Sequence, residues 1–362
     1  MASFEIIFYL IFCRLYNSFN GIINVTYKLS AAIKFINKFN LYKRVMEVNM
    51  DNKKALDILE NLKKVIMGKD EVLEKVLIAL FARGHLLIED VPGVGKTTLV
   101  KALARSMDLS YKRVQFTPDL MPSDIIGISV YDKNTGAFFF KKGPIFNQVF
   151  LADEINRTSP KTQSSLLQAM EEGEVSTEES HYILEKPFMV LATQNPLEYQ
   201  GTFPLPEAQL DRFLMRLSLG YPEKQSEIEI LQNYQSIKNL NLIEPVVSQE
   251  DILEMQSMVD EITVHRDIID YIVNISNTTR IYEDLRLGAS PRASIDLLKA
   301  AKSKAFLAGR DYVIHDDVKK MVVPVLGHRL ILSPEARIEQ KGIEDILKEV
   351  LSHVFVPVMT DE

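Results

Sequence analysis

The sequence LLIEDVPGVGKTT, from Leu86 to Thr98, decides which fold this chain can adopt. It begins with an apolar run typical of a buried strand and continues through a glycine-rich loop to Lys96 and Thr97. Such loops surround polyphosphates with backbone N–H groups, and the helix that follows adds its positive dipole end. We therefore predict a strand, a phosphate-binding loop and a helix that bind a nucleoside triphosphate.

The loop also predicts individual contacts to ATP. Lys96 is expected to reach the β and γ phosphates, and the Thr97 hydroxyl is expected to bind Mg²⁺. Asp90 occupies the place of the first glycine in the usual G-x-x-x-x-G-K-[ST] pattern, and Asp tolerates left-handed backbone angles better than most residues. The alternative is a glycine-rich turn that binds nothing. The predicted ATP contacts are Asp90, Val91, Pro92, Gly93, Val94, Gly95, Lys96, Thr97 and Thr98.

Composition is that of a globular protein. The chain has 362 residues, of which 46% are hydrophobic and 25% charged, enough for two domains and a large core. The net charge of −7 and the lack of a long basic run after the first fifty residues argue against nucleic-acid binding. A single cysteine, Cys13, excludes an internal disulfide, and the six histidines lack metal-ligand spacing. We expect a cytoplasmic protein.

Residues 1–50 differ from the rest in being rich in Phe, Ile, Tyr, Asn and Lys. The apolar stretch from Ile6 to Phe12 is shorter than the roughly 20 residues of a membrane-spanning helix, and no basic segment precedes it. Three interpretations remain open: a start assigned too early, with Met46 or Met50 as the true first residue, a short membrane-surface or partner helix, or a disordered extension. We favour the first, and we expect no membrane association unless residues 1–50 belong to the native protein.

From Lys53 onward, apolar runs alternate with segments of helical periodicity. Buried strands separated by helices predict a parallel sheet with helices on both faces. We predict a five-stranded α/β domain over residues 51–221 and a smaller helical domain over residues 222–362. The expected strands are Leu86–Glu89, Val114–Phe116, Val149–Ala152, Phe188–Ala192 and Phe213–Leu219. The expected helices of the second domain are Lys224–Lys238, Gln249–Val259, Asp267–Tyr282, Pro291–Ala308 and Ile314–Leu326.

Two adjacent carboxylates follow the apolar run Val149–Ala152. They lie at the carboxyl end of a buried strand, the edge where ligands bind in open α/β sheets. Asp153 is expected to hold Mg²⁺ through water, and Glu154 to polarise the water that attacks the γ phosphate. The alternative is an ordinary acidic loop after a strand.

Other polar residues complete the predicted site. Asn195 follows the Phe188–Ala192 strand and is expected to orient the attacking water, a role compatible with a turn before Pro196. Arg212, just before the last strand, is expected to stabilise charge on the nucleotide of a neighbouring subunit, although a solvated helix-end charge is the alternative. We interpret Arg216 as a charge on a strand face.

Arg292 lies at the start of a helix with unusually complete signals. Ser290 is placed to cap it, Pro291 is in the first turn and Gly309 follows its end. We expect Arg292 to contact the γ phosphate from the second domain and to move with that domain as the nucleotide changes. An isolated surface arginine would have no such role.

In this order, the motifs DVPGVGKTT, VFLADEINR, ATQNP, LPEAQLDRF and GASPRA resemble those of the AAA+ ATPases, and most closely the MoxR branch. The resemblance extends from about Lys53 to about Val356. It implies an αβα AAA+ nucleotide-binding domain followed by an all-helical lid domain. It also implies that Lys96 and Thr97 are the Walker A pair, Asp153 and Glu154 the Walker B pair, Asn195 sensor 1, Arg212 the arginine finger and Arg292 sensor 2.

The resemblance further implies a homo-oligomeric ring, usually hexameric, that uses ATP and Mg²⁺ to remodel, mature or activate a protein client. A von Willebrand factor A domain protein is the implied partner. The alternatives are the ATPase subunit of a metal chelatase, a nucleic-acid motor, and a nucleotide-gated scaffold with little turnover. The acidic composition argues against the motor, and the intact set of Glu154, Asn195 and Arg212 argues against the scaffold.

Two segments have the alternation of β-hairpins: Tyr131–Phe140 (YDKNTGAFFF) and Val175–Leu184 (VSTEESHYIL). Projecting hairpins of this kind can line the pore of a ring and grip a client. Burial in a core is the commoner fate of consecutive phenylalanines, and it remains the alternative for the first hairpin.

Overall fold

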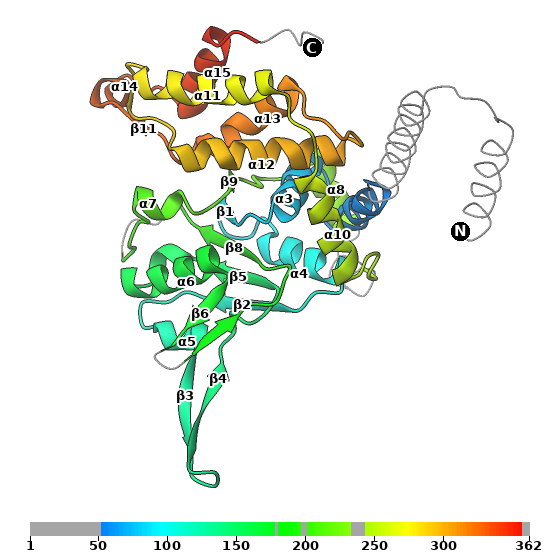
Figure 1. The fold of residues 1–362 in the computed structure, drawn as a ribbon, viewed down its shortest axis with the longest axis vertical. Coiled ribbons are helices and arrows are strands. Elements are labelled where there is room, and N and C mark those ends of the chain that lie inside the picture. The colour runs from blue at the N-terminus through cyan, green and yellow to red at the C-terminus, as the bar shows by residue number, and fades with distance from the viewer. Residues whose placement is uncertain (1–51, 178–179, 197–200, 233–242, 357–362) are drawn as a thin grey trace, which may run out of the picture. The chain divides into compact units, whose positions relative to one another are not determined.

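The structure is a computed structural model, and it describes residues 52–177, 180–196, 201–232 and 243–356. These described residues belong to one compact unit, whose elements are labelled in Figure 1. The interpretations of residues 1–50 lie outside the described residues. Among the residues described, no helix has the length and apolar character needed to cross a membrane.

A five-stranded sheet forms the centre of this unit, with strand order β2-β5-β8-β1-β9 and every pairing parallel. This confirms the predicted five-stranded parallel α/β domain. The edge strand β2 begins at Tyr111 rather than at the predicted Val114. Three of its five residues, Lys112, Arg113 and Gln115, are polar and exposed, so its start lacks the apolar run that marks a buried strand. The strands are β1 Leu86–Glu89, β2 Tyr111–Gln115, β5 Val149–Asp153, β8 Met189–Gln194 and β9 Met215–Leu217.

Helices cover both faces of the sheet, and the strand residues divide between the two faces. In β1, Leu86 and Ile88 belong to one buried cluster and Leu87 to the other, as the alternation of a strand requires. The first cluster includes α3 (Asp70–Phe81) and α4 (Lys96–Ser106), and the second includes α6 (Pro160–Glu172). The near-continuous apolar runs of β5 and β8 follow from burial on both sides.

The lid is helical, as predicted, and contains one addition: β10 (Leu285–Leu287) and β11 (Ile331–Leu332) form a short antiparallel pair. Ser290 caps α12 by accepting a hydrogen bond from the Ala293 backbone N–H at 3.1 Å. Because one buried cluster runs from α3 into the lid, the division at residue 221 stays a prediction. The helices of this part are α8 Lys224–Gln232, α10 Gln249–Asp260, α11 Arg266–Ile281, α12 Pro291–Leu307, α13 His315–Leu326, α14 Pro334–Ile338 and α15 Ile343–His353.

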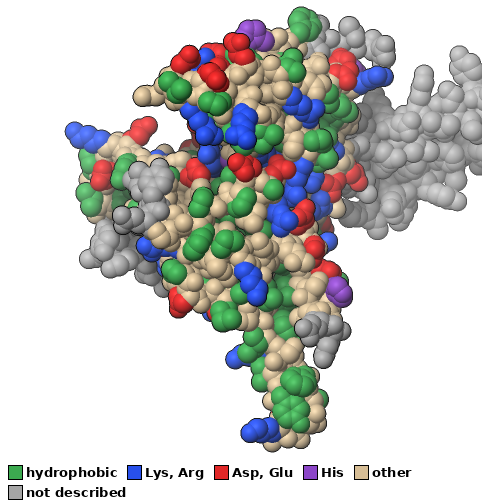
Figure 2. Space-filling view, turned by 90° about the vertical axis from the view of Figure 1, so that its left-hand side faces the viewer, with side chains coloured by type: hydrophobic (Ala, Val, Ile, Leu, Met, Phe, Trp, Pro, Cys, Tyr) green, Lys and Arg blue, Asp and Glu red, His purple; other side chains and the backbone are tan. Residues whose placement is uncertain are grey.

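Both predicted hairpins are confirmed. β3 (Gly127–Asp132) pairs with β4 (Ala137–Lys142), and β6 (Glu174–Ser176) pairs with β7 (His181–Ile183). The first hairpin follows α5 (Pro122–Ile126) and projects away from the sheet (Figure 1). Figure 2 shows hydrophobic side chains on its projecting end. Exposed aromatic residues there include Tyr131, Phe138 and Phe139.

Candidate nucleotide-binding site

The loop between β1 and α4 has the open backbone that a polyphosphate needs. Gly93 and Gly95 adopt φ angles of 89° and 93°, which favour glycine, and a Cβ built at either position would meet no atom within 4 Å. Gly95 is the N-cap of α4, so the positive end of this helix faces the same space. Unfilled space in front of a glycine backbone at a helix N-terminus fits a bound phosphate chain.

A pocket of about 350 Å³ joins this loop to the carboxyl ends of β2, β5 and β8. Six lining residues come from the loop and the start of α4: Pro92, Gly93, Gly95, Lys96, Thr97 and Thr98. Five more come from the strands and the residues after them: Arg113, Gln115, Asp153, Glu154 and Asn195. Most of the sequence-predicted residues are therefore brought together, whereas Asp90, Val91 and Val94 do not line the pocket.

Asp90 differs from its prediction. Its backbone is not left-handed, and its buried carboxylate accepts hydrogen bonds from Ser218 Oγ at 2.9 Å and from the backbone N–H groups of Leu219 and Gly220. Its carbonyl oxygen accepts a hydrogen bond from Lys96 Nζ at 2.9 Å. The left-handed backbone predicted for Asp90 is therefore wrong. Its side chain instead binds the segment after β9 to the phosphate loop.

A hydrogen-bond network fixes the acidic pair. Thr193 Oγ1 donates to Asp153 Oδ1 at 2.6 Å and accepts from the Glu154 backbone N–H at 2.9 Å. Arg113 pairs with Asp153 Oδ2 at 2.6 Å. Glu154 has a left-handed backbone, with φ 60° and ψ 50°, at the start of the 3₁₀ helix Ile155–Arg157. Its Oε2 accepts hydrogen bonds from Gln115 Nε2 at 2.7 Å and Arg157 Nη1 at 2.9 Å.

Sequence reasoning missed Arg113, Gln115 and Thr193. Arg113 and Gln115 alternate along the edge strand β2, and this period-2 polar pattern is the signal that could have found them. Thr193 is fully buried in β8 and offers no signal of its own. The oxygen donors Thr97 and Asp153 face the same pocket, and hydroxyl and carboxylate oxygens are the ligands that Mg²⁺ accepts in phosphate-binding sites.

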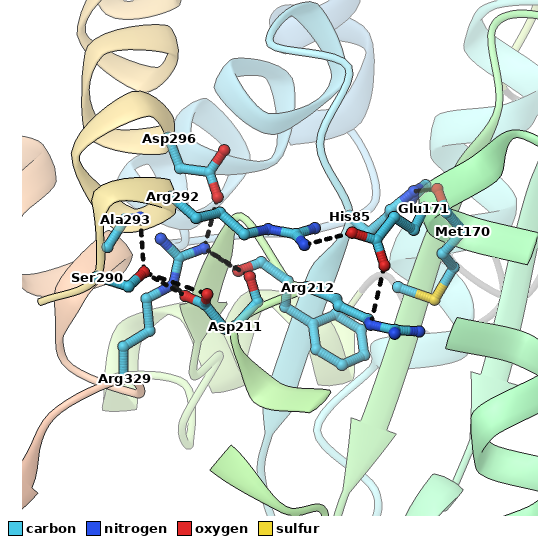
Figure 3. A network of polar contacts seen from close by, with 11 residues as sticks. His85, Met170, Glu171, Asp211, Arg212, Ser290, Arg292, Ala293, Asp296 and Arg329 are labelled. Carbon is cyan, nitrogen blue, oxygen red and sulfur yellow. Dashed lines mark hydrogen bonds and ion pairs between the residues drawn. The ribbon is translucent and has the colours of Figure 1, made fainter. Parts of the chain in front are cut away.

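The two remaining predicted residues, Arg212 and Arg292, do not line this pocket. Both pair with Glu171, at the end of α6: Arg212 Nε lies 3.2 Å from Oε2 and Arg292 Nη1 lies 2.7 Å from Oε1. Figure 3 shows the two guanidinium groups meeting at this one carboxylate. Arg216 instead pairs with Glu89 at 3.0 Å, in keeping with a charge on a strand face.

A buried histidine, His85, holds the main chain next to Glu171. His85 Nδ1 accepts a hydrogen bond from the Val190 backbone N–H at 3.0 Å, and its Nε2–H donates to the Met170 carbonyl oxygen at 3.0 Å. Burial lowers the pKa of His85 to about 4, and the nearby charge of Arg292 acts in the same direction against the opposing Met170 carbonyl. The ring is therefore neutral at pH 7 and fixes the residue that precedes Glu171.

Comparisons with known families agree with this geometry. Residues 85–215 match the family described as "ATPase family associated with various cellular activities (AAA)", and residues 277–350 match the AAA lid domain. These two ranges contain the phosphate loop, the acidic pair and the helix that carries Arg292.

Similar proteins cover most of the chain. Protein YeaC of Bacillus subtilis is 49% identical over 83% of this chain and 94% of its own length. Chaperone MoxR1 of Mycobacterium tuberculosis is 40% identical over 82% of this chain and 80% of its own length. A solved structure from Cytophaga hutchinsonii superposes with a TM-score of 0.82 at 38% identity, covering 89% of this chain and all of that one.

Proposed function

This chain belongs to the MoxR family of AAA+ ATPases, and we propose that it hydrolyses ATP, with Mg²⁺, at the boundaries between subunits of a homo-oligomeric ring. The observation that carries the proposal is the single pocket that the phosphate loop shares with Asp153, Glu154 and Asn195. Phosphoryl transfer depends on positioning and charge stabilisation, and these residues supply both.

Each residue has a distinct proposed role. The loop backbone and Lys96 bind the phosphates, and Thr97 and Asp153 hold Mg²⁺, which would neutralise charge on the phosphates when bound. Glu154 takes the proton of the attacking water and Asn195 orients that water. In the structure Glu154 Oε2 accepts hydrogen bonds from Gln115 and Arg157, which stabilise the ionised carboxylate, so we infer that Glu154 becomes a stronger base when these bonds open.

Arg212 acts in this proposal on the nucleotide of a neighbouring subunit. Arg292, which the sequence predicted to contact the γ phosphate from the second domain of its own chain, is assigned here to the same neighbouring nucleotide. Two observations support it: neither residue lines the pocket of its own chain, and both meet at Glu171. Glu171 is a carboxylate that already occupies the position of an anion between two guanidinium groups. A phosphate presented by the next subunit would take its place.

The proposed output is mechanical work on a protein client in the cytoplasm. The exposed aromatic residues of the β3–β4 hairpin, Tyr131, Phe138 and Phe139, are suited to contact a client in a ring pore. A relative is named a chaperone, which supports the same role here. The hexameric ring and a von Willebrand factor A domain partner belong to this proposal as well.

The test of hydrolysis is the Glu154→Gln variant. We expect turnover to fall by about a thousandfold, because a general base contributes about 10²–10⁴, while ATP binding measured by fluorescence titration is retained. Glu172→Gln, an exposed change on α6, is the matched control and should behave as wild type. Wild-type turnover in Glu154→Gln would contradict the assigned base.

The test of action between subunits is a mixing experiment. Glu154→Gln subunits present an intact Arg212 but cannot hydrolyse ATP, and Arg212→Ala subunits keep the base but lack the finger. We expect mixtures to hydrolyse ATP faster than the sum of the separate preparations. Mixtures that show only this sum would refute the assignment of Arg212 to a neighbour's nucleotide.

A further inference from the structure

Arg212 lies between two residues that are both held by the lid of the same chain. Asp211 precedes it at the end of α7 (Glu207–Leu210), and Phe213 follows it before β9. Lid contacts to both neighbours come from the start of α12 and from the segment between α13 and β11. Figure 3 shows Ser290 and Arg329 beside Asp211, next to the Glu171 pair.

Arg329 contacts both residues that flank Arg212. Its Nη2 donates to the Phe213 carbonyl oxygen at 2.7 Å, to the Asp211 carbonyl oxygen at 3.3 Å and to Asp296 Oδ2 of α12 at 2.6 Å. Its Nε lies 3.2 Å from Asp211 Oδ1, as an ion pair. One side chain therefore joins α12 to the main chain on both sides of Arg212.

Two further lid residues support the same short segment. His328 Nε2–H donates to the Phe213 carbonyl oxygen at 2.9 Å. Ser290, the N-cap of α12, donates through Oγ to the Asp211 carboxylate at 3.2 to 3.3 Å. The cap of α12 and the α13–β11 segment thus act on the same two residues.

The chemistry of this joint favours a role in orientation. The Arg329 side chain is 2% exposed, and a buried guanidinium is costly unless carboxylates and carbonyls compensate it. Apolar residues could join two domains without that cost, but they would not fix a direction. Hydrogen bonds to the carbonyl oxygens of both residues that flank Arg212 do fix the direction of the main chain there.

The same face of α12 also reaches the Arg212 side chain. Asp296 lies four residues after Arg292, so the two share a helix face, and Arg292 pairs with the carboxylate that Arg212 contacts. A displacement of α12 would act on the main chain of Arg212 through Arg329 and on its ion-pair partner through Arg292.

We propose that Arg329 is a positioning residue that couples Arg212 to the lid of its own subunit, so that a lid displacement changes the arginine presented to the next subunit. This inference rests on the proposed action of Arg212 on a neighbour's nucleotide. It adds a direction of communication: the position of the lid in one subunit controls hydrolysis in the adjacent subunit.

The experiment extends the mixing test by adding Arg329→Met to one partner at a time. When the donor, Glu154→Gln, also carries Arg329→Met, we expect its stimulation of the Arg212→Ala acceptor to fall by about tenfold or more, since a small misplacement of a catalytic group costs up to about 10²-fold. When the acceptor carries Arg329→Met instead, stimulation by an unmodified donor should stay close to its original value. A merely structural role would not produce this asymmetry.

Two further variants keep the test decisive. Asp296→Asn weakens the same joint from α12 and serves if Arg329→Met does not fold; it should show the same donor-side loss. Arg310→Met is the matched control, because Arg310 forms a partly buried ion pair with Asp317 inside the lid at 2.6 Å. In the donor it should leave stimulation unchanged.

The outcomes separate the two proposals. A donor-side loss for Arg329→Met or Asp296→Asn, with Arg310→Met unaffected, supports the coupling. Equal losses in donor and acceptor, or no loss in the donor, overturn it while leaving Arg212 assigned. If the unmodified donor fails to stimulate the acceptor, the action of Arg212 between subunits is wrong, and the coupling falls with it.

Discussion

Two buried histidines lie against the residues that the proposed mechanism uses. His85 contacts the carbonyl of Met170, next to Glu171, and His328 contacts the carbonyl of Phe213, next to Arg212. Burial and, to a lesser degree, the adjacent Arg329 charge lower the pKa of His328 to about 3, while the hydrogen bond to the Phe213 carbonyl acts in the opposite direction. Each ring is neutral and donates one hydrogen bond to a carbonyl oxygen. Protonation of either ring would disturb that contact, and through it the position of the adjacent Glu171 or Arg212.

The depressed pKa values predict a loss of stability in acid. Unfolded histidines bind protons below about pH 6.5, whereas the folded ones bind them only near about pH 4 and about pH 3, so the unfolding free energy falls as pH decreases through this window. Between about pH 7 and about pH 5 each histidine should cost about 2 kcal/mol. Urea unfolding at both pH values measures this.

His328→Gln tests the assignment, because glutamine can still donate to the Phe213 carbonyl but does not titrate. The fall between about pH 7 and about pH 5 should shrink by about 2 kcal/mol, and the double variant with His85→Gln should shrink it about twice as much. An undiminished fall in the double variant would show that other groups cause the acid sensitivity.

Asp90→Gly restores the common phosphate-loop pattern, and the structure predicts that it destabilises the protein. The variant removes the acceptor of hydrogen bonds from Ser218, Leu219 and Gly220, and bonds to a charged group contribute about 1.5–3 kcal/mol each. Because the three bonds share one carboxylate, their contributions do not add in full, and we expect the unfolding free energy to fall by about 3 kcal/mol, with Asp90→Asn intermediate. Denaturant unfolding that leaves Asp90→Gly as stable as wild type would contradict this.

At the scale of elements, the hairpins and the sheet followed from alternation in the sequence, but their pairing partners did not. The three phenylalanines Phe138, Phe139 and Phe140 look equivalent in sequence. In the structure Phe140 stacks on Tyr182 of the second hairpin with ring centroids 4.4 Å apart, whereas Phe138 and Phe139 are exposed. The sequence left open whether these phenylalanines are buried or exposed. Contact between the two hairpins packs Phe140 and leaves the other two exposed.

This difference predicts opposite results for two alanine variants. Phe140→Ala should lower the unfolding free energy by about 2 kcal/mol, because it removes a stacked and partly buried ring. Phe139→Ala should change it by less than about 0.5 kcal/mol. Hydrogen exchange over residues 127–142 should rise only in the first variant, and equal effects would mean that the hairpins do not pack as described.

The edge strand β2 explains why part of the site escaped prediction. Lysine, arginine and glutamine dilute the apolar signal of this strand, so its predicted start was Val114 and neither Arg113 nor Gln115 was assigned to the site. The loop, the acidic pair and Asn195 were predictable because each follows an apolar run of a central strand. Pairing across elements, such as Thr193 with Asp153, depends on tertiary neighbours that local patterns do not contain.

For the whole molecule, the described chain holds its phosphate loop and its candidate arginines in separate places. The pocket contains the loop, the acids and the amide, while Arg212 and Arg292 meet at Glu171. The order of motifs predicted both the pocket residues and the two arginines. It did not predict that these two groups lie in separate places, because residues assigned to one reaction are expected to form a single site until the fold is known.

Separate locations predict that activity depends on assembly. Specific ATPase activity should fall on dilution through the dissociation range, measured by light scattering, because arginine fingers contribute about 10³ or more to turnover. Arg212→Ala should be slow at every concentration and show little dilution effect. Constant specific activity while wild-type assemblies dissociate would show that one chain is sufficient for catalysis.

The placement of Glu171 between two guanidinium groups has a consequence for incomplete assemblies. A subunit without a neighbour keeps both guanidinium groups paired with its own Glu171, which offsets one of their two positive charges and weakens their attraction for other anions. In the proposed ring, addition of a subunit with bound ATP would therefore be favoured over addition of an empty one, because the triphosphate can displace the Glu171 carboxylate from the two arginines and an empty loop cannot. Assembly would thus favour subunits that already hold nucleotide.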